Sequence, residues 1–315
     1  MKLYQNTFYG RRYKRWTIIE TIAYFIKGIS RELKLAPLFF NELYEKVAMR
    51  AFKKKWLKNE NHDGEIRTYY DFKGAKLPEI TNNNMLRFFR YSFEDVFLVP
   101  CFYNDNYKQD FVRFLDQHVL NESVYGYCDN TINVTIEKGD IVIDAGAWIG
   151  DFSAYAASKG AIVYAFEPDL KLFDLLCKTK ELNETDEERI FPIQKGLGSG
   201  DHKMNFSLDT ISGAGNSLVI DRGTNETAVI DVITLDSFVK ERHLEKVDFI
   251  KADIEGAERD MLRGAFNVLK IHAPKLVICT YHLPDDPEVL EKIILEANPK
   301  YKIIHLKKKL FAAVI

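Results

Sequence analysis

From about Val134 to the C-terminus, short β-rich apolar segments alternate with stretches that have helical periodicity. The predicted strands are 141–144, 162–167, 190–195, 247–251, 276–280 and 301–306, and the predicted helices are 149–158, 170–182, 258–269 and 288–297. Such alternation is typical of an α/β domain in which helices cover both faces of a parallel sheet. Between residues 204 and 231 Gly, Ser, Asn and Thr predominate, which predicts a loop or small hairpin beside the carboxyl ends of the strands, where such sheets bind ligands.

The first part of the chain differs from the rest in pattern and in charge. Of the 315 residues, the first 60 contain 14 Lys or Arg and 5 Asp or Glu, whereas the remainder contain 30 and 41. Apolar periodicity predicts helices within 12–58, 84–97 and 105–118, and alternating residues between turn signals predict a hairpin within 61–80. We therefore expect a mainly helical N-terminal domain, 1–119, before a second domain at 120–315.

Composition limits the kinds of binding partner and the cellular compartment that we expect for this protein. The net charge of −2 argues against a nucleic-acid partner, and the most apolar stretch, 16–26, is too short to span a membrane. The four cysteines lack CxxC spacing, which is typical of reduced structural thiols. We expect a cytoplasmic protein whose basic segment, 11–15, belongs to a lid or a homo-oligomer contact; the alternative is peripheral docking on an anionic membrane.

A glycine-rich loop follows the first of these predicted strands and indicates a ligand. The strand ends at Asp144, Gly146 and Gly150 permit a tight turn, and a helix begins near Ile149. The G-x-x-x-G spacing differs from the G-x-G-x-x-G of dinucleotide folds, and a carboxylate beside the loop is unfavourable for a diphosphate. A cationic ligand such as S-adenosylmethionine suits this loop better, although a turn-forming role for Asp144 is an alternative.

The next predicted strand ends in a second carboxylate. Glu167 and Pro168 lie some twenty residues beyond the glycine loop, where a carboxylate can accept hydrogen bonds from two ribose hydroxyls. The alternative is that Glu167 caps the helix that starts after it. Together the two motifs favour a nucleoside-type ligand, and the choice between a methyl donor and a dinucleotide depends on the loop spacing.

Several linked motifs of the chain resemble the FkbM-type family of S-adenosylmethionine-dependent methyltransferases. The matching segments are 144–153, 165–169, 233–237, 247–258, 262–265, 281–282 and 298–301. The resemblance covers the chain from about Val134 onward and implies a Rossmann-like seven-strand methyltransferase sheet with helices on both faces. It also implies methylation of a hydroxyl on a sugar or polyketide-like acceptor, with the D-x-E-G segment facing the reaction centre.

The loop, the strand ends and the resemblance together give the expected cofactor contacts: Asp144, Gly146, Ala147, Trp148, Gly150, Glu167, Pro168, Gly196 and Asp253. Trp148 stands where the family often has a small amide, so a backbone contact is expected there. Gly196 is expected to let the chain pass the adenine, and Asp253 to help hold the amino-acid part of the cofactor.

Two predicted neighbouring strands end in groups that suit acid–base chemistry. His282 is the expected general base because its unperturbed pKa lies near neutral pH; the alternative is a hydrogen-bonded turn histidine before Pro284. Asp253 and Glu255 are expected to arrange the acceptor, although Asp253 could pair with Lys251, and Glu255 could begin the next helix. Alternation along an extended strand would bring Lys251, Asp253 and Glu255 to one rim of the site.

The acceptor is expected to contact Lys251, Ser217 and Tyr281. A divalent metal is not expected, because the sequence shows no ligand beyond the Asp, Glu and His at these strand ends at a telling spacing. The predicted function is therefore S-adenosylmethionine-dependent O-methylation of a carbohydrate or glycan-precursor hydroxyl. Two alternatives stay open: an NAD-dependent oxidoreductase on a related α/β fold, and a non-catalytic methyltransferase-like binding or assembly protein.

Overall fold

The computed structural model describes residues 46, 49–50, 52–62, 64–72, 74–82, 85–86, 89, 125–184, 187–208, 216–219, 227–306 and 308–315. The basic segment 11–15, most of the helices predicted within 12–58 and 84–97, all of 105–118, and the predicted domain boundary at 119/120 lie outside the described residues. The interpretations placed on those segments stay predictions.

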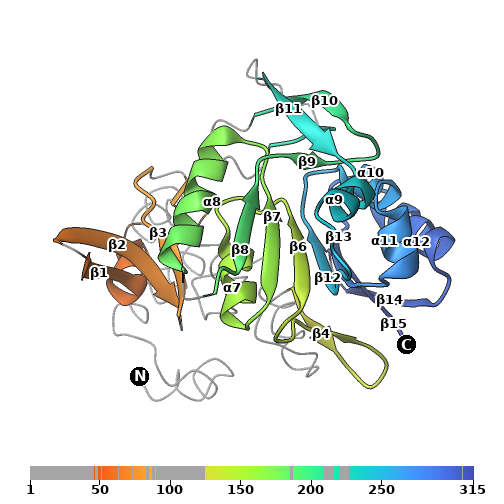
Figure 1. Ribbon diagram of the computed structural model, residues 1–315, viewed down its shortest axis with the longest axis horizontal. Coiled ribbons are helices and arrows are strands. Elements are labelled where there is room, and N and C mark those ends of the chain that lie inside the picture. Colours follow the sequence, from red (N-terminus) through yellow and green to blue (C-terminus); the bar gives the residue numbers. More distant parts are fainter. Residues whose placement is uncertain are drawn as a thin grey trace, which may run out of the picture.

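A seven-stranded mixed sheet with the order β14-β15-β13-β12-β6-β7-β8 forms the centre of the protein (Figure 1). Its strands are β6 (Ile141–Ala145), β7 (Ile162–Phe166), β8 (Ile190–Ile193), β12 (Phe249–Ala252), β13 (Lys275–Cys279), β14 (Tyr301–Leu306) and β15 (Lys309–Val314). The pairs from β13 to β8 are parallel, whereas β15 runs antiparallel to both β13 and β14. The six strands expected from the sequence are confirmed, and β15 is an addition.

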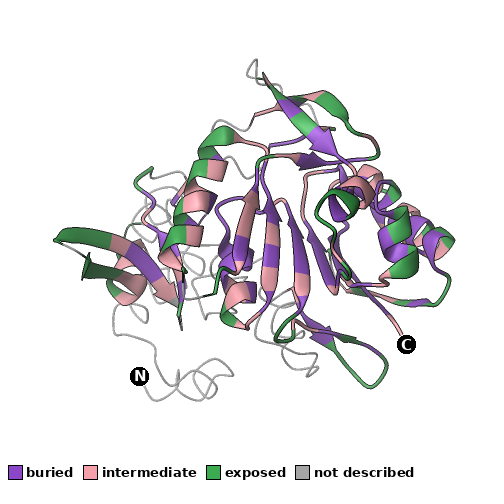
Figure 2. Ribbon diagram, viewed as in Figure 1, coloured by how far each residue is buried: buried purple, intermediate pink, exposed green. Residues whose placement is uncertain are grey.

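Helices cover both faces of this sheet because successive strand residues point to opposite sides. The helices are α7 (Asp151–Ser158), α8 (Leu170–Leu182), α9 (Leu235–Glu241), α10 (Glu258–Arg263), α11 (Phe266–Ile271) and α12 (Asp286–Ala297). Val142 of β6 packs in the apolar cluster that contains α7 and α8, and its neighbour Ile143 packs in the cluster that contains α9 to α12. Figure 2 shows that the central strands are largely buried.

The helix predicted over 258–269 is two helices, α10 and α11, with Gly264 between them. A Cβ at Gly264 would lie 2.0 Å from the carbonyl oxygen of Gly198, so only glycine fits this close approach of two backbones. The first helix, α10, begins at Glu258, whose side chain lies beside His282 in the candidate site.

A small second sheet stands where the sequence predicted a loop or hairpin. Its strands are β9 (Gly196–Leu197), β10 (His202–Ser207) and β11 (Thr227–Ile233), in the order β10-β11-β9. The strands β10 and β11 pair antiparallel, so the hairpin alternative is confirmed. Figure 1 draws this sheet above the central one.

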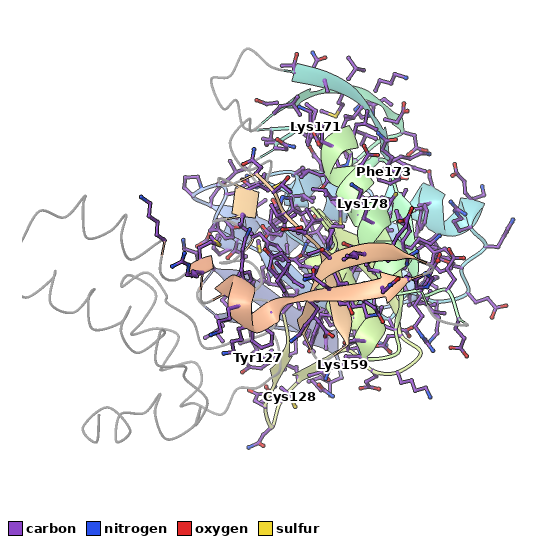
Figure 3. All side chains as sticks on the ribbon, turned by 90° about the vertical axis from the view of Figure 1, so that its left-hand side faces the viewer. Tyr127, Cys128, Lys159, Lys171, Phe173 and Lys178 are labelled. Carbon is purple, nitrogen blue, oxygen red and sulfur yellow. The ribbon has the colours of Figure 1, made fainter. Side chains whose placement is uncertain are left out.

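The described residues before 125 lie mostly in a three-stranded antiparallel sheet: β1 (Leu57–His62), β2 (Glu65–Phe72) and β3 (Ala75–Pro78). The predicted hairpin is confirmed and has a third strand, whereas a mainly helical N-terminal domain is not shown. In this part the described helical residues are 46, 49–50, 52–56, 85–86 and 89, within the stretches 12–58 and 84–97 in which helices were predicted. Figure 3 shows this sheet crossing in front of α8, which carries the labelled residues Lys171, Phe173 and Lys178.

The three-stranded sheet shares a core with the central one. The backbone N–H of Lys76 donates to Asn183 Oδ1 over 2.8 Å, and Asn183 Nδ2 donates back to the Lys76 carbonyl over 2.6 Å. Tyr70 and Phe89 are fully buried in the apolar cluster of α7 and α8. A short hairpin, β4 (Tyr127–Cys128) and β5 (Asn133–Val134), leads into β6. In the described part of the chain, no helix is both long and apolar enough to cross a bilayer.

Candidate active site

The glycine loop passes directly over the end of β12. Gly146 has a φ of +75°, and a Cβ there would lie 2.1 Å from the carbonyl oxygen of Asp253. The N–H groups of Gly146 and Ala147 both donate to the Phe166 carbonyl, over 3.1 and 2.9 Å, and the Asp253 N–H donates to Ala145. The loop therefore ties together the ends of β6, β7 and β12.

A buried ion pair supports the loop from below. Lys251 Nζ lies 2.9 Å from Asp144 Oδ1 and donates to the Gly146 carbonyl over 2.7 Å. The other oxygen of Asp144 accepts from Ser153 Oγ over 2.6 Å. Burial lowers the pKa of Lys251, but Asp144 outweighs this and the pKa rises to about 12, so the ammonium stays charged. The structure thus places Asp144 and Lys251 together beneath the loop.

Glu167 lies at the end of β7, beside the glycine loop. Its carboxylate accepts from the backbone N–H of Trp148 over 3.0 Å and from that of Asp169 over 2.9 Å. Burial raises the pKa of Glu167 to about 8, although the Asp169 N–H works against this shift. A buried carboxylate of this kind gains from additional hydroxyl donors, which is the environment that a ribose would supply.

Asp253, just after β12, receives hydrogen bonds from two tyrosines. Tyr281 donates to Oδ1 over 2.9 Å, and Tyr125 donates to Oδ2 over 3.3 Å. Burial raises the pKa of Asp253, but the positive charges of Lys251 and His282 outweigh it, so the pKa lies below its usual value. Asp253 is therefore an oriented carboxylate at the ends of β12 and β13.

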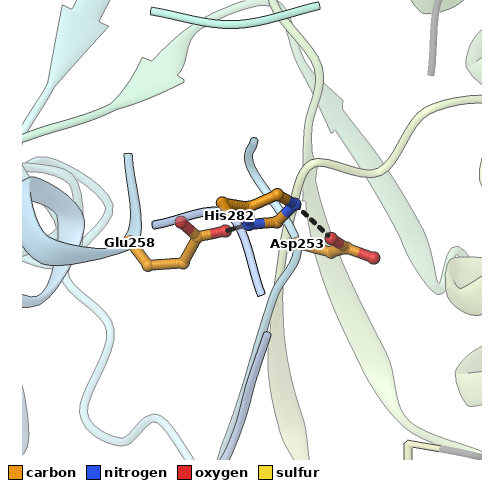
Figure 4. Close-up of side chains that lie close together, drawn as sticks. All are labelled: Asp253, Glu258 and His282. Atoms are coloured by element: carbon orange, nitrogen blue, oxygen red, sulfur yellow. Dashed lines mark ion pairs between the residues drawn. The ribbon is translucent and has the colours of Figure 1, made fainter. Parts of the chain in front are cut away.

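His282, after β13, lies among three carboxylates, of which Figure 4 draws those of Asp253 and Glu258. Its Nδ1 is 3.0 Å from Glu258 Oε1, while its Nε2 is 3.4 Å from Glu255 Oε1 and 3.5 Å from Asp253 Oδ1. Burial lowers the pKa of His282, but Glu255 and Glu258 raise it to about 10. The unperturbed pKa that suggested a general base is therefore not the one that this environment produces.

Glu255 is presented by an unusual turn. It has a φ of +53°, which is uncommon for a residue with a long side chain, and Gly256 follows with a φ of +101°. Ser217 Oγ donates to the Glu255 carbonyl over 2.6 Å, so the described piece 216–219 of the loop between β10 and β11 is anchored on this turn. Backbone strain of this kind is often retained where a side chain must face a ligand.

The structure brings most of the expected residues together. Contacts link the loop, Asp144, Lys251, Asp253, Glu255, Ser217, Tyr281 and His282 into one continuous site, and Glu167 joins it through Trp148. Pro168 follows Glu167 directly, Gly150 is the N-cap of α7, and Gly196 lies in β9 against Ile230 and Leu218. None of these contacts tests a cofactor, so the assignments stay predictions.

Two residues of the site were missed in the sequence analysis. Tyr125 lies upstream of the recognisable motifs and reaches Asp253 only through the fold. Glu258 starts α10 and is fully buried, with Oε1 accepting from Ile254 N and Oε2 from Gly256 N. The sequence could have indicated Glu258. An acidic residue in the first turn of a helix can accept hydrogen bonds from the backbone N–H groups of the turn before it, here the D-x-E-G turn.

The sheet order, the glycine loop after β6 and the acid at the end of β7 are those of a Rossmann-like S-adenosylmethionine-dependent methyltransferase. The chain belongs to the methyltransferase FkbM domain family, which it matches over residues 144–301. The protein is therefore an S-adenosylmethionine-dependent methyltransferase. This family match favours neither the oxidoreductase nor the non-catalytic alternative.

Individual relatives are more distant. The hexuronic acid methyltransferase AglP of Haloferax volcanii is 29% identical over 172 residues, which cover 55% of this chain and 68% of that protein. Methyltransferase sdnD of Sordaria araneosa is 25% identical over 179 residues, covering 47% and 68%. Among solved structures, the FkbM methyltransferase of Methylobacillus flagellatus is 24% identical, with a TM-score of 0.43 over 57% of this chain and 44% of that one.

Proposed function

We propose that this protein transfers the methyl group of S-adenosylmethionine to a hydroxyl of an acidic carbohydrate. The observation that carries the proposal is the group of carboxylates, Asp253, Glu255 and Glu258, gathered beside the glycine loop. Negative side chains suit removal of a proton from a neutral hydroxyl, and they oppose the approach of a carboxylate as the methyl acceptor. The hexuronic acid methyltransferase among the relatives supports a carbohydrate acceptor.

The residues present fit the cofactor. S-Adenosylmethionine, when bound, supplies an electrophilic methyl group on a sulfonium sulfur. Glu167 would accept hydrogen bonds from the ribose hydroxyls, and the backbone at Gly146 would pass close to the ligand because no Cβ intervenes. Asp253, held by Tyr125 and Tyr281, would face the ammonium group of the amino-acid part.

Glu255 is the group that we assign to the acceptor proton. Its strained turn directs the carboxylate to the same place as His282 Nε2, at the ends of β12 and β13. As the hydroxyl oxygen bonds to the methyl carbon, the electron pair of the broken carbon–sulfur bond stays on sulfur and the hydroxyl proton moves to Glu255. Most of the rate then comes from holding the two reacting atoms in line.

Two lysines at the rim favour an acidic acceptor. Lys308 lies 5.2 Å from the ring centre of Tyr281, and Lys309 lies 4.9 Å from that of Tyr125. Both tyrosines donate to Asp253, so a single tyrosine side chain separates each lysine ammonium group from Asp253. If these lysines bind the carboxylate of an acidic sugar, the ring hydroxyls of that sugar would face Glu255.

Labelled S-adenosylmethionine and a panel of acceptors test this function. We expect transfer to uronic-acid oligosaccharides, much weaker transfer to neutral oligosaccharides of the same length, and none to phenols or proteins. Glu255→Gln should lower kcat by about two orders of magnitude, the usual effect of losing a proton acceptor. Preferential labelling of a phenol or a protein would contradict the proposal.

The raised pKa of Glu167 makes cofactor binding depend on pH. The ionised carboxylate is the form that accepts ribose hydroxyls, so below pH 8 binding must also remove a proton from Glu167. Affinity should therefore rise from pH 6 to pH 8 and then level off, with proton release on binding. Asp169 raises this pKa and Lys251 lowers it, and neither is altered in the variant below.

Calorimetry in two buffers of different ionisation enthalpy measures the released proton. Glu167→Gln should bind S-adenosylmethionine more weakly, by more than about tenfold, and should lose the pH dependence. Glu181→Gln, which changes an exposed carboxylate of α8, is the matched control and should behave as the parent protein. An unchanged affinity in Glu167→Gln would remove the ribose assignment.

A further inference from the structure

His282 and two carboxylates form a compact buried cluster at the ends of β12 and β13. One ligand atom from each of Asp253, Glu258 and His282 can be chosen so that all three atoms lie within 4.8 Å of one another. The side chain of His282 is 3% exposed and that of Glu258 is fully buried. Figure 4 shows the imidazole between the two carboxylates.

The imidazole is close to these carboxylates without a well-directed hydrogen bond. Neither ring nitrogen of His282 has a hydrogen-bond partner among the residues that the structure describes, although Glu258 Oε1 is 3.0 Å from Nδ1. Buried polar nitrogens normally have a partner, because leaving one unpaired costs about 1–3 kcal/mol. Buried nitrogen and oxygen atoms that lie close together without hydrogen-bond geometry are candidate ligands of a metal ion.

The local charge also favours a cation. Within the described residues, Asp253 and Glu258 have no lysine or arginine at ion-pair distance; Lys251 pairs with Asp144, and the positive charge beside the two carboxylates is that of His282 in its protonated form. When His282 is neutral, as a metal ligand must be, the two buried carboxylates are left without this compensating charge, which is costly. A divalent ion would neutralise both of them.

We propose that Asp253, Glu258 and His282 bind one first-row divalent cation. Two carboxylates and one imidazole form a donor set that suits Mn²⁺ or Zn²⁺. Ligand atoms around a tetrahedral ion with bonds of about 2.1 Å lie about 3.4 Å apart, so the cluster needs to close by about 1.4 Å at most.

Surrounding groups already orient the ligands. Tyr281 and Tyr125 donate to Asp253, and the N–H groups of Ile254 and Gly256 donate to Glu258. Such outer hydrogen bonds fix the direction of metal ligands in proteins. The ion would stand beside Glu255, where it could hold the acceptor oxygen while Glu255 takes its proton. In this last respect the inference rests on the proposed function, but cation binding itself does not.

Manganese binding to the full chain tests the inference without cofactor or acceptor. The protein, stripped with a chelator and free of any affinity tag, is titrated with MnCl₂ while electron paramagnetic resonance measures the free ion. We expect one Mn²⁺ per chain and a rise in Tm. His282→Gln and Glu258→Gln should each weaken binding by more than about tenfold. Circular dichroism verifies that each variant is folded, and Asp253→Asn replaces a variant that is not.

The matched control is His305→Ala, because His305 forms an exposed pair with Glu291 far from this cluster in the sequence. It should bind Mn²⁺ as the parent protein does. The inference is overturned by a parent protein with no saturable Mn²⁺ binding and no Tm change in ZnCl₂. It is equally overturned by saturable binding that survives in the folded cluster variants. Loss of ion binding would leave methyl transfer to be judged separately by the labelled-acceptor assay.

Discussion

Gly146→Ala is expected to destabilise the protein by about 3 kcal/mol or more and to abolish cofactor binding. The new Cβ would meet the Asp253 carbonyl oxygen at 2.1 Å, and the residue has a φ of +75°. Neither backbone can yield easily, because the Asp253 N–H is bonded to Ala145 and the Gly146 N–H to Phe166. Urea unfolding measures the stability and calorimetry measures the binding.

Gly139→Ala separates the two causes. Gly139 also has a positive φ, +85°, but a Cβ there has no atom within 4 Å. This variant should cost only the strain of the left-handed backbone, about 1–2 kcal/mol, and should bind S-adenosylmethionine normally. If Gly146→Ala were as stable as Gly139→Ala, the close contact between the loop and the β12 end would be wrong.

Lys251→Met is expected to cost about 3–5 kcal/mol, because it leaves a buried charge without its partner. Asp144 is fully buried, and its pairing with Lys251 at 2.9 Å supplies the compensating charge. The variant also removes a donor to the Gly146 carbonyl, so the loop should loosen and the cofactor should bind less tightly. Urea unfolding with circular dichroism gives the free energy of unfolding.

The double variant Asp144→Asn with Lys251→Met identifies the cause. It removes both charges, so it should be more stable than Lys251→Met alone, which a simple loss of packing would not produce. Lys246→Met is the control, because Lys246 lies 2.7 Å from Asp248 but is 55% exposed. Its cost should stay below about 1 kcal/mol. Equal costs for Lys246→Met and Lys251→Met would contradict the role given to burial.

Much of the sheet could be predicted because its strands and helices have clear periodicity. The segment 170–182 is α8 as expected, and 301–306 is β14. The last strand, β15, was missed because it follows β14 after only two residues, 307 and 308, and pairs antiparallel with β13, outside the alternating βα pattern. The three-stranded sheet before residue 82 was partly predicted, since turn signals gave its hairpin but not β1.

The site shows where sequence spacing fails. Alternation along a strand was expected to bring Lys251, Asp253 and Glu255 to one rim, but β12 ends at Ala252 and a turn follows. Lys251 therefore lies beneath the loop with Asp144, whereas Asp253 and Glu255 approach His282. Positive φ angles at Glu255 and Gly256 reverse the chain and return Glu258 to the same place, which no spacing rule shows.

The chemical bond formed in the product tests the central claim most directly. The protein is incubated with methyl-labelled S-adenosylmethionine and a uronic-acid oligosaccharide, and the purified product is treated with alkali. A methyl ether on a hydroxyl survives this treatment, whereas a methyl ester on a carboxylate is hydrolysed. Our account predicts that the label stays on the sugar. Release of the label by alkali, or no transfer to the sugar at all, would contradict it.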